Sequence, residues 1–204
     1  MIKNIVFDMG NVLVSYDGMR VCEHYIENVH DRRVVFNSLF LSPEWVYLDM
    51  GVISEEQAMK QICARLPECL REKAFLCMRD WHLYNMQTVQ EMEPVIRSLK
   101  AKGYGIYLCS NASMRLPACY KDYLPALDCF DGILFSAEEK CIKPQKEIYE
   151  RFFGKFGLKP EECFFIDDLQ LNIDGAKACG MDGYCFADRD IGKLKEVLEQ
   201  LKED

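Results

Sequence analysis

Five short apolar runs constrain the fold most, because each is followed within two residues by a polar side chain. They lie at residues 5–7, 106–109, 133–135, 163–166 and 184–186. Runs that are apolar at successive positions are typical of strands buried on both faces, as in parallel sheets. We therefore predict five buried parallel strands.

Helical patterns separate the later runs. They cover residues 93–102, 145–156 and 172–179, and each closes on a glycine. Glycine just beyond a helix end is a common boundary, as is the proline that precedes the second of these helices. A last amphipathic helix is predicted at about residues 191–201. This alternation predicts an α/β fold with a doubly wound, Rossmann-like parallel sheet.

One interval breaks the strand–helix rhythm. Roughly 70 residues separate the first strand from the helix that leads into the second, whereas a crossover needs only about a dozen. Helical patterns fill this interval, at residues 19–29, 54–66 and 67–81. We therefore predict a small inserted helical cap at residues 15–85. Residues 1–14 and 86–204 then form the α/β core.

The charge and the apolar patterning argue against nucleic acid and membranes as partners. The chain carries 33 Asp and Glu against 25 Lys and Arg, a net charge of −8, and has no run of more than two cations. Nucleic-acid binding needs a concentrated basic face, so we expect no nucleic-acid partner. No apolar stretch approaches the ~20 residues that span a bilayer. The N-terminus also lacks the pattern of a signal peptide, so we expect a cytoplasmic chain with no membrane partner.

The cysteine and histidine spacing argues against disulfides and zinc. The eleven cysteines are odd in number and never form Cys-x-x-Cys. We expect reduced thiols that behave mostly as small buried hydrophobes. The three histidines have no zinc-like spacing to one another or to a cysteine pair.

Polar residues follow the predicted strands at their carboxyl ends. Ligands of open parallel sheets bind beyond these ends, so we expect the following residues to share one crevice. In chain order they are Asp8, Met9, Gly10, Ser110, Asn111, Lys143, Asp167, Asp168 and Asn172. The set combines three carboxylates, a hydroxyl and a lysine.

This combination fits phosphoryl transfer, which needs a nucleophile and neutralisation of the phosphoryl oxygens. Asp8 is the candidate nucleophile, because a carboxylate is anionic at neutral pH and can form an aspartyl-phosphate. Asp8, Asp168 and a carbonyl near Gly10 are candidate Mg²⁺ ligands. Asp167 and Asn172 complete the predicted metal site as supports for the metal-bound waters.

The phosphate itself has a separate set of candidates. Lys143 offers a point charge and is also a candidate catalytic residue, while Ser110 offers a hydroxyl donor. The amides of Met9 and Gly10, in a tight glycine turn, could form an anion-binding nest. Asn111 is a further phosphate-binding candidate. Its alternative role is to set the conformation of its loop.

Four ordered motifs resemble those of the haloacid dehalogenase-like hydrolases. They are Phe-Asp-x-Gly-Asn-Val-Leu at 7–13, Leu-Cys-Ser-Asn at 108–111, Lys-Pro at 143–144 and Phe-Ile-Asp-Asp-x-x-x-Asn-x-x-Gly-Ala at 165–176. Residues 48–56 of the cap resemble a segment of the branch of the α-glucose-1-phosphate phosphatase type. The resemblance implies a Mg²⁺-dependent phosphatase that acts on a small phosphorylated metabolite, such as a sugar phosphate.

The sequence departs from this family at Gly10. Most phosphatases of the family carry a second aspartate there, which acts as general acid toward the leaving group. General acid catalysis typically contributes ~100-fold to 10,000-fold, and its loss slows poor leaving groups most. Gly10 alone therefore predicts a bias toward anomeric, acyl or aryl phosphates.

Two other functions remain as alternatives, and a third is set aside. A metal-independent dehalogenase of the same fold would use the same aspartate, but it has no use for the acidic pair Asp167 and Asp168. A catalytically weakened phosphate-binding or regulatory protein is suggested by Gly10. A signalling receiver domain combines similar residues, but its acidic pair follows the first strand.

Three aromatic residues of the cap, Trp45, Tyr47 and Trp81, have two interpretations. They can pack in the core of the cap or stack on a substrate, and core packing is the more frequent role. Arg20 can reach toward a substrate, but a solvated helix face is its more typical place. No cap residue therefore enters the predicted site.

Overall fold

The core of the protein is a five-stranded parallel sheet. In this computed structural model, which describes residues 1–201, the strand order is β5-β4-β1-β6-β7 and every neighbouring pair is parallel. The strands are β1 (Asn4–Phe7), β4 (Gly105–Ser110), β5 (Gly132–Phe135), β6 (Cys163–Asp167) and β7 (Asp182–Cys185). All five predicted strands and the doubly wound α/β fold are confirmed.

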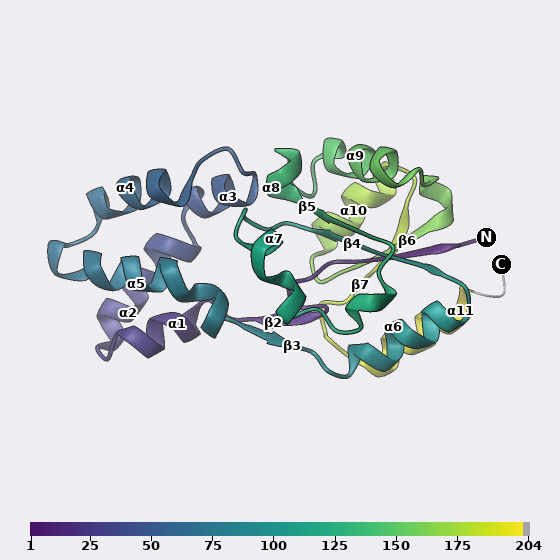
Figure 1. Cartoon of the computed structure of the whole chain (residues 1–204), viewed down its shortest axis with the longest axis horizontal. Coiled ribbons are helices and arrows are strands. Elements are labelled where there is room, and N and C mark those ends of the chain that lie inside the picture. The colour runs from purple at the N-terminus through teal and green to yellow at the C-terminus, as the bar shows by residue number, and fades with distance from the viewer. Residues whose placement is uncertain (202–204) are drawn as a thin grey trace.

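Helices cover both faces of this sheet (Figure 1). Ile5 and Phe7 of β1 pack in the apolar cluster that holds α6 (Met92–Ala101) and α11 (Ile191–Gln200). Val6, which points the other way, packs with α9 (Lys146–Phe156) and α10 (Gln170–Ala178). The central strand β1 is therefore buried on both sides, which explains its continuous apolar run.

A helical lobe is inserted after β1. We give this name to residues 19–84, which form five helices between the strands β2 (Val14–Tyr16) and β3 (Met86–Thr88). The two strands pair antiparallel and connect the lobe to the sheet, as Figure 1 shows. The helices are α1 (Met19–Tyr25), α2 (Val29–Phe40), α3 (Pro43–Asp49), α4 (Glu55–Arg65) and α5 (Glu68–Tyr84).

The start of the lobe differs from the prediction. The single helix predicted at 19–29 is wrong, because α1 ends at Tyr25 and Ile26 is extended. Asn28 then caps α2, since its side chain accepts hydrogen bonds from two amides of the first turn. The helices predicted at 54–66 and 67–81 are confirmed as α4 and α5, and α4 begins with a capping box at Ser54 and Gln57.

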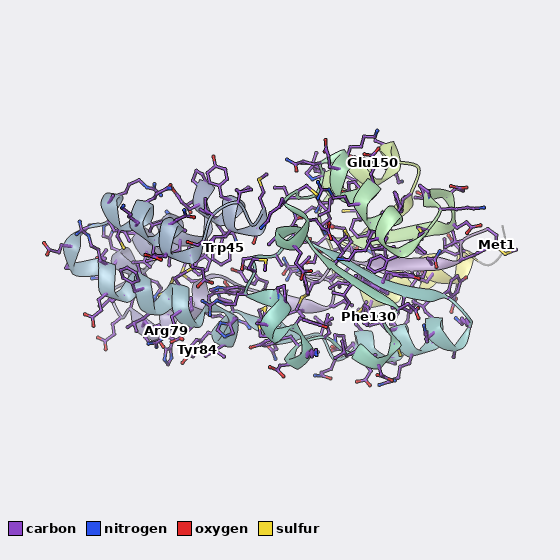
Figure 2. All side chains as sticks on the ribbon, turned by 45° about the horizontal axis from the view of Figure 1, so that its top comes forward. Met1, Trp45, Arg79, Tyr84, Phe130 and Glu150 are labelled. Atoms are coloured by element: carbon purple, nitrogen blue, oxygen red, sulfur yellow. The ribbon has the colours of Figure 1, made fainter. Side chains whose placement is uncertain are left out.

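The lobe has an aromatic interior. Trp81 is buried and lies with its ring centroid 5.3 Å from Trp45 and 6.2 Å from Tyr16. Figure 2 shows Trp45 within the lobe and Arg79 and Tyr84 at its outer edge. Within residues 1–201, no helix has the length and apolar character to cross a bilayer.

A loop after α3 docks the lobe on the core. The hydroxyl of Ser136 in α8 (Ser136–Glu139) donates to the carbonyl oxygen of Asp49 at 2.5 Å, and the Lys140 ammonium donates to that of Gly51 at 2.6 Å. Gly51 has a φ of +65°, and a Cβ there would lie 2.2 Å from the Ala137 carbonyl oxygen. Only glycine therefore fits this contact.

Short elements complete the core. Arg115, just before α7 (Leu116–Cys119), forms a two-armed ion pair with Glu55 of the lobe. Three single-turn 3₁₀ helices lie at Tyr120–Asp122, Leu127–Cys129 and Pro160–Glu162.

Six of the eleven cysteines are buried and Cys69 is exposed.

Candidate active site

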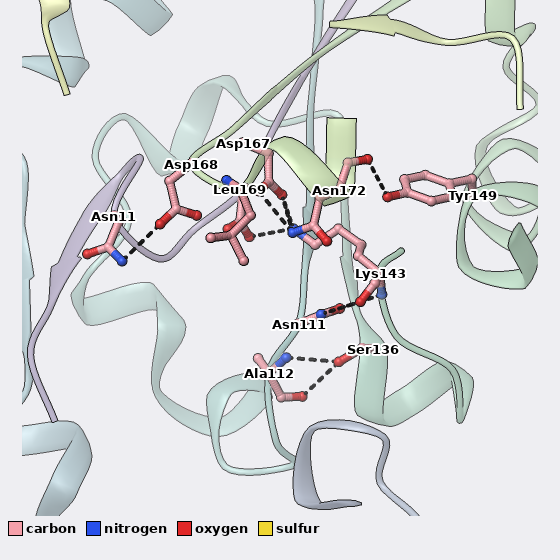
Figure 3. A network of polar contacts seen from close by, with 11 residues as sticks. Asn11, Asn111, Ala112, Ser136, Lys143, Tyr149, Asp167, Asp168, Leu169 and Asn172 are labelled. Atoms are coloured by element: carbon pink, nitrogen blue, oxygen red, sulfur yellow. Dashed lines mark hydrogen bonds and ion pairs between the residues drawn. The ribbon is translucent and has the colours of Figure 1, made fainter. Parts of the chain in front are cut away.

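A cavity of about 310 Å³ lies where the carboxyl ends of β1, β4 and β6 face the helical lobe. Eight of the nine predicted site residues line it, and the ninth, Asp167, lies fully buried within reach of Asp8 and Asp168. The expected convergence of polar residues at one edge of the sheet is therefore present. Figure 3 shows the polar network that several of these residues form.

Three carboxylates form the centre of the site. Asp8, Asp167 and Asp168 each offer an oxygen, and these oxygens lie within 4.8 Å of one another. The backbone amide of Asp8 donates to the Ile166 carbonyl oxygen at 2.8 Å, which ties the end of β1 to β6. Adjacent central strands therefore bring these acids together.

Lys143 lies buried between two of these acids. Its ammonium is 2.9 Å from Asp8 Oδ1 and 2.6 Å from Asp167 Oδ2. Burial lowers the pKa of Lys143, but the carboxylates of Asp167 and Asp8 outweigh burial and raise its pKa overall. Lys143 is therefore charged at neutral pH and compensates part of the negative charge of the site.

The environment of Asp8 makes it a weaker acid than usual. The pKa of Asp8 is raised to about 6, with burial as the largest effect and the Asp167 charge adding to it. Lys143 and the Ser110 hydroxyl act in the opposite direction. Asp8 is still mostly ionised at pH 7, as a nucleophile must be.

Asp167 is held by donors from three sides. Besides Lys143, it accepts hydrogen bonds from the Leu169 amide at 2.9 Å and from Asn172 Nδ2 at 2.9 and 3.1 Å (Figure 3). These donors occupy most of its lone pairs. Asp167 and Asn172 therefore form a rigid support, whereas Asp8 and Asp168 have more acceptor capacity left.

Asn11 sets the loop after β1. Its φ is +57°, its side chain donates to Asp168 Oδ2 at 3.1 Å, and its side-chain oxygen accepts from the Tyr16 amide at 3.3 Å. The left-handed residue of this turn is thus Asn11 rather than Gly10. Asparagine tolerates this conformation better than most residues.

Asn111 contacts the backbone of Lys143 with both ends of its amide. It accepts from the Lys143 amide at 2.8 Å and donates to the Lys143 carbonyl oxygen at 3.0 Å. Ser110, at the end of β4, is 3% exposed and lines the cavity. The geometry favours the loop-setting role of Asn111 over the phosphate-binding one.

The donor set fits Mg²⁺. Asp8 Oδ1 is buried and accepts no hydrogen bond, although the Lys143 ammonium lies beside it. Asp168 accepts a side-chain hydrogen bond from Asn11, and Gly10, whose backbone carbonyl is the other candidate ligand, lines the cavity. A few carboxylate and carbonyl oxygens with space for water and phosphate are what this ion prefers.

The other side of the cavity comes from the helical lobe and its two connecting strands. Tyr16, Trp45, Asp49, Trp81 and Met86 line it. Trp81 therefore both fills the lobe core and borders the cavity, while Tyr47 is 44% exposed and does neither. None of these lobe residues was predicted from the sequence to belong to the site. The sequence feature that could have pointed to Asp49 is its place two residues before Gly51, in the segment that resembles the family.

Comparisons with known proteins agree with this architecture. Residues 2–180 match the model of the haloacid dehalogenase-like hydrolases. The sesquiterpene phosphatase astK of Aspergillus oryzae is 25% identical over 190 residues, which cover 91% of this chain and 90% of that protein. The D-ribitol-5-phosphate phosphatase of Bacteroides thetaiotaomicron is 26% identical over 195 residues, with 90% and 91% covered.

A solved structure supports the fold. A haloacid dehalogenase-family enzyme of Bacteroides thetaiotaomicron, in complex with magnesium and inorganic phosphate, superposes with a TM-score of 0.69. It is 21% identical, and the match covers 91% of this chain and 94% of that one. The overall fold is therefore shared with an enzyme of known structure.

Proposed function

Since the chain belongs to the haloacid dehalogenase-like hydrolase family, we propose that it is a Mg²⁺-dependent phosphatase that hydrolyses a small phosphate monoester through an aspartyl-phosphate on Asp8. The observation that carries the proposal is the group of three acids, two of which form ion pairs with one buried lysine. Two of the relatives named above are phosphatases, which supports the same reaction class.

The polar residues around the three acids have the following roles in this reaction. Asp8 attacks phosphorus and takes the phosphoryl group, while Lys143 and Ser110 bind the phosphoryl oxygens. Asp8, Asp168 and the Gly10 carbonyl would hold Mg²⁺, with Asp167 and Asn172 fixing the geometry around them. The ion, when bound, offsets the repulsion between the substrate phosphate and Asp8.

The side of the cavity opposite the acids guides the choice of substrates to test. We propose that residues 15–85 act as a cap that supplies the wall for the leaving group. This wall contains Tyr16, Trp45 and Trp81, and aromatic rings pack well against an apolar group or the apolar face of a sugar. A substrate panel should therefore contain sugar, polyol, isoprenoid and aryl monophosphates.

The test is steady-state phosphate release from this panel, with wild type, Asp8→Asn and the control Asp174→Asn. Asp174 is exposed on α10 and does not line the cavity. We expect metal-dependent turnover that is lost in Asp8→Asn and kept in Asp174→Asn. A folded protein that binds Mg²⁺ and phosphate without turnover would instead be a phosphate-binding or regulatory protein.

The dehalogenase alternative gives a different result with a chelator. Displacement of halide by an aspartate needs no metal, so activity on 2-haloacids would survive EDTA. The proposed phosphatase activity is expected to disappear in EDTA and to return when Mg²⁺ is added in excess.

A further inference from the structure

Gly10 leaves an open space in the site. A Cβ at Gly10 would meet no atom within 4 Å, and this residue lines the cavity. The position at which the resemblance implies a general acid therefore carries no group that can donate a proton. If a side chain protonates the leaving oxygen, it must therefore be another residue of the cavity wall.

Asp49 is the acid that the helical lobe contributes to this wall. Among residues 1–201, the carboxylic acids that line the cavity are Asp8, Asp168 and Asp49. Asp8 and Asp168 belong to the three-acid group that is proposed to hold the nucleophile and the metal. Asp49 does not belong to that group, and it comes from the side of the cavity where the leaving group would lie.

The backbone around Asp49 is fixed to the core. Its carbonyl oxygen accepts the Ser136 hydroxyl, and two residues later the Gly51 carbonyl oxygen accepts the Lys140 ammonium. Gly51 also lies directly against the Ala137 carbonyl. A group that transfers a proton must be held in position, and these contacts hold Asp49 over the site.

We propose that Asp49 is the general acid that replaces the missing acid at position 10. This inference rests on the proposed phosphatase function. As Asp8 attacks phosphorus, the bond from phosphorus to the leaving oxygen breaks and the Asp49 carboxyl gives its proton to that oxygen. In the second half, the Asp49 carboxylate takes a proton from the water that attacks the aspartyl-phosphate, so both acids return to their starting states.

The surroundings of Asp49 suit this role. Burial is the largest effect on Asp49 and the Asp8 charge adds to it, while the Ser113 backbone amide acts in the opposite direction, and together they raise the pKa of Asp49 to about 7. A substantial fraction of Asp49 therefore carries a proton at neutral pH. The nearby Tyr16 hydroxyl is a poor substitute, because burial raises its pKa far above the neutral range.

The test compares two substrates of similar size, phenyl phosphate and 4-nitrophenyl phosphate. Nitrophenolate leaves without a proton, whereas phenolate leaves slowly unless it is protonated. We expect Asp49→Asn to lower kcat/KM for phenyl phosphate by ~100-fold or more and to change that for 4-nitrophenyl phosphate by less than about tenfold. The matched control is Glu56→Gln, an exposed acid of the same lobe outside the cavity, which should leave both rates unchanged.

Several results would overturn the inference. An equal loss on both substrates, or no loss on either, in a variant with the wild-type melting temperature would exclude Asp49 as the acid. A wild-type measurement avoids the question of folding: across a series of aryl phosphates, kcat/KM should fall only weakly as the leaving-group pKa rises. A steep fall in wild type would contradict the proposal.

The two proposals fail in different ways. If wild type hydrolyses neither substrate, the phosphatase function fails and this inference fails with it. If wild type hydrolyses both and Asp49→Asn behaves like wild type, the phosphatase function stands and Asp49 is not the acid. The bias toward good leaving groups that Gly10 alone predicts is expected in Asp49→Asn rather than in wild type.

Discussion

Lys143 shows how much of the site depends on one buried side chain. It is 2% exposed, and its positive charge compensates the negative charges of both Asp8 and Asp167. Removing one partner of a buried ion pair typically costs about 3–5 kcal/mol, because the remaining charge stays buried without compensation. We expect Lys143→Met to lower the free energy of unfolding by about this amount in metal-free protein, measured by urea denaturation.

The control for Lys143→Met is Lys146→Met. Lys146 is a neighbouring lysine whose ion pair with Glu150 is exposed, and such pairs contribute about 0–1 kcal/mol. If both variants lost the same small amount of stability, the charge compensation assigned to Lys143 would be wrong.

A second residue-scale prediction concerns pH. Arg65 binds the buried Glu44 carboxylate with two hydrogen bonds, at 2.8 and 2.6 Å, and holds the pKa of Glu44 below its usual value against the effect of burial. A lowered pKa in the folded state stabilises the protein above the usual glutamate pKa, and this contribution is lost as the pH falls. We expect Arg65→Met to cost about 1–3 kcal/mol at pH 7 and progressively less below pH 4.5, by urea denaturation at each pH.

The loop that follows α3 carries the element-scale prediction. Gly51 and Gly157 have nearly equal φ values, +65° and +66°, but a Cβ at Gly157 would meet no atom within 4 Å. An alanine at either position lowers the stability by about 1 kcal/mol or more, because the left-handed backbone is unfavourable for it. We expect Gly51→Ala to lower the melting temperature more than Gly157→Ala, and to lower turnover as well, because it separates Asp49 from the core. Equal effects of the two variants would show that this docking contact is unimportant.

The elements that the sequence predicts well are those with long, regular patterns. The five strands and the core helices follow from runs buried on both faces and from glycine or proline boundaries. The helices α2 and α3 were not predicted, because α2 has little amphipathic contrast and α3 is a short helix defined by its cap at Ser42. The strands β2 and β3 have three residues each, too few to show an alternation.

The same contrast between regular patterns and irregular contacts explains why most of the site was predicted and Asp49 was not. Asp8, Ser110, Lys143 and Asp168 come together because parallel strands end at one edge, which is a rule of topology. Asp49 reaches the cavity through the orientation of the lobe, which depends on contacts such as that of Gly51 with Ala137. No local pattern encodes that contact.

At the scale of the whole molecule, ligand binding should stabilise the assembly of lobe and core. A ligand at 100 times its Kd adds about 2.7 kcal/mol to the free energy of unfolding. We expect Mg²⁺ together with inorganic phosphate to raise the melting temperature of wild type. EDTA should reverse the rise, and Asp168→Asn should show little of it. A similar rise in Asp168→Asn would remove Asp168 from the metal site.

The central place of β1 has a consequence for motion. This strand is bonded to β4 on one side and to β6 on the other, and the Asp8 amide continues the second ladder. Amides in such positions exchange with deuterium only when the whole domain unfolds, whereas peripheral helices exchange through local openings. We expect peptides from β1 to take up deuterium far more slowly than peptides from α1 and α2, by mass spectrometry. The Asp8 carboxylate at the end of this strand is then expected to keep its alignment while helices of the lobe open locally.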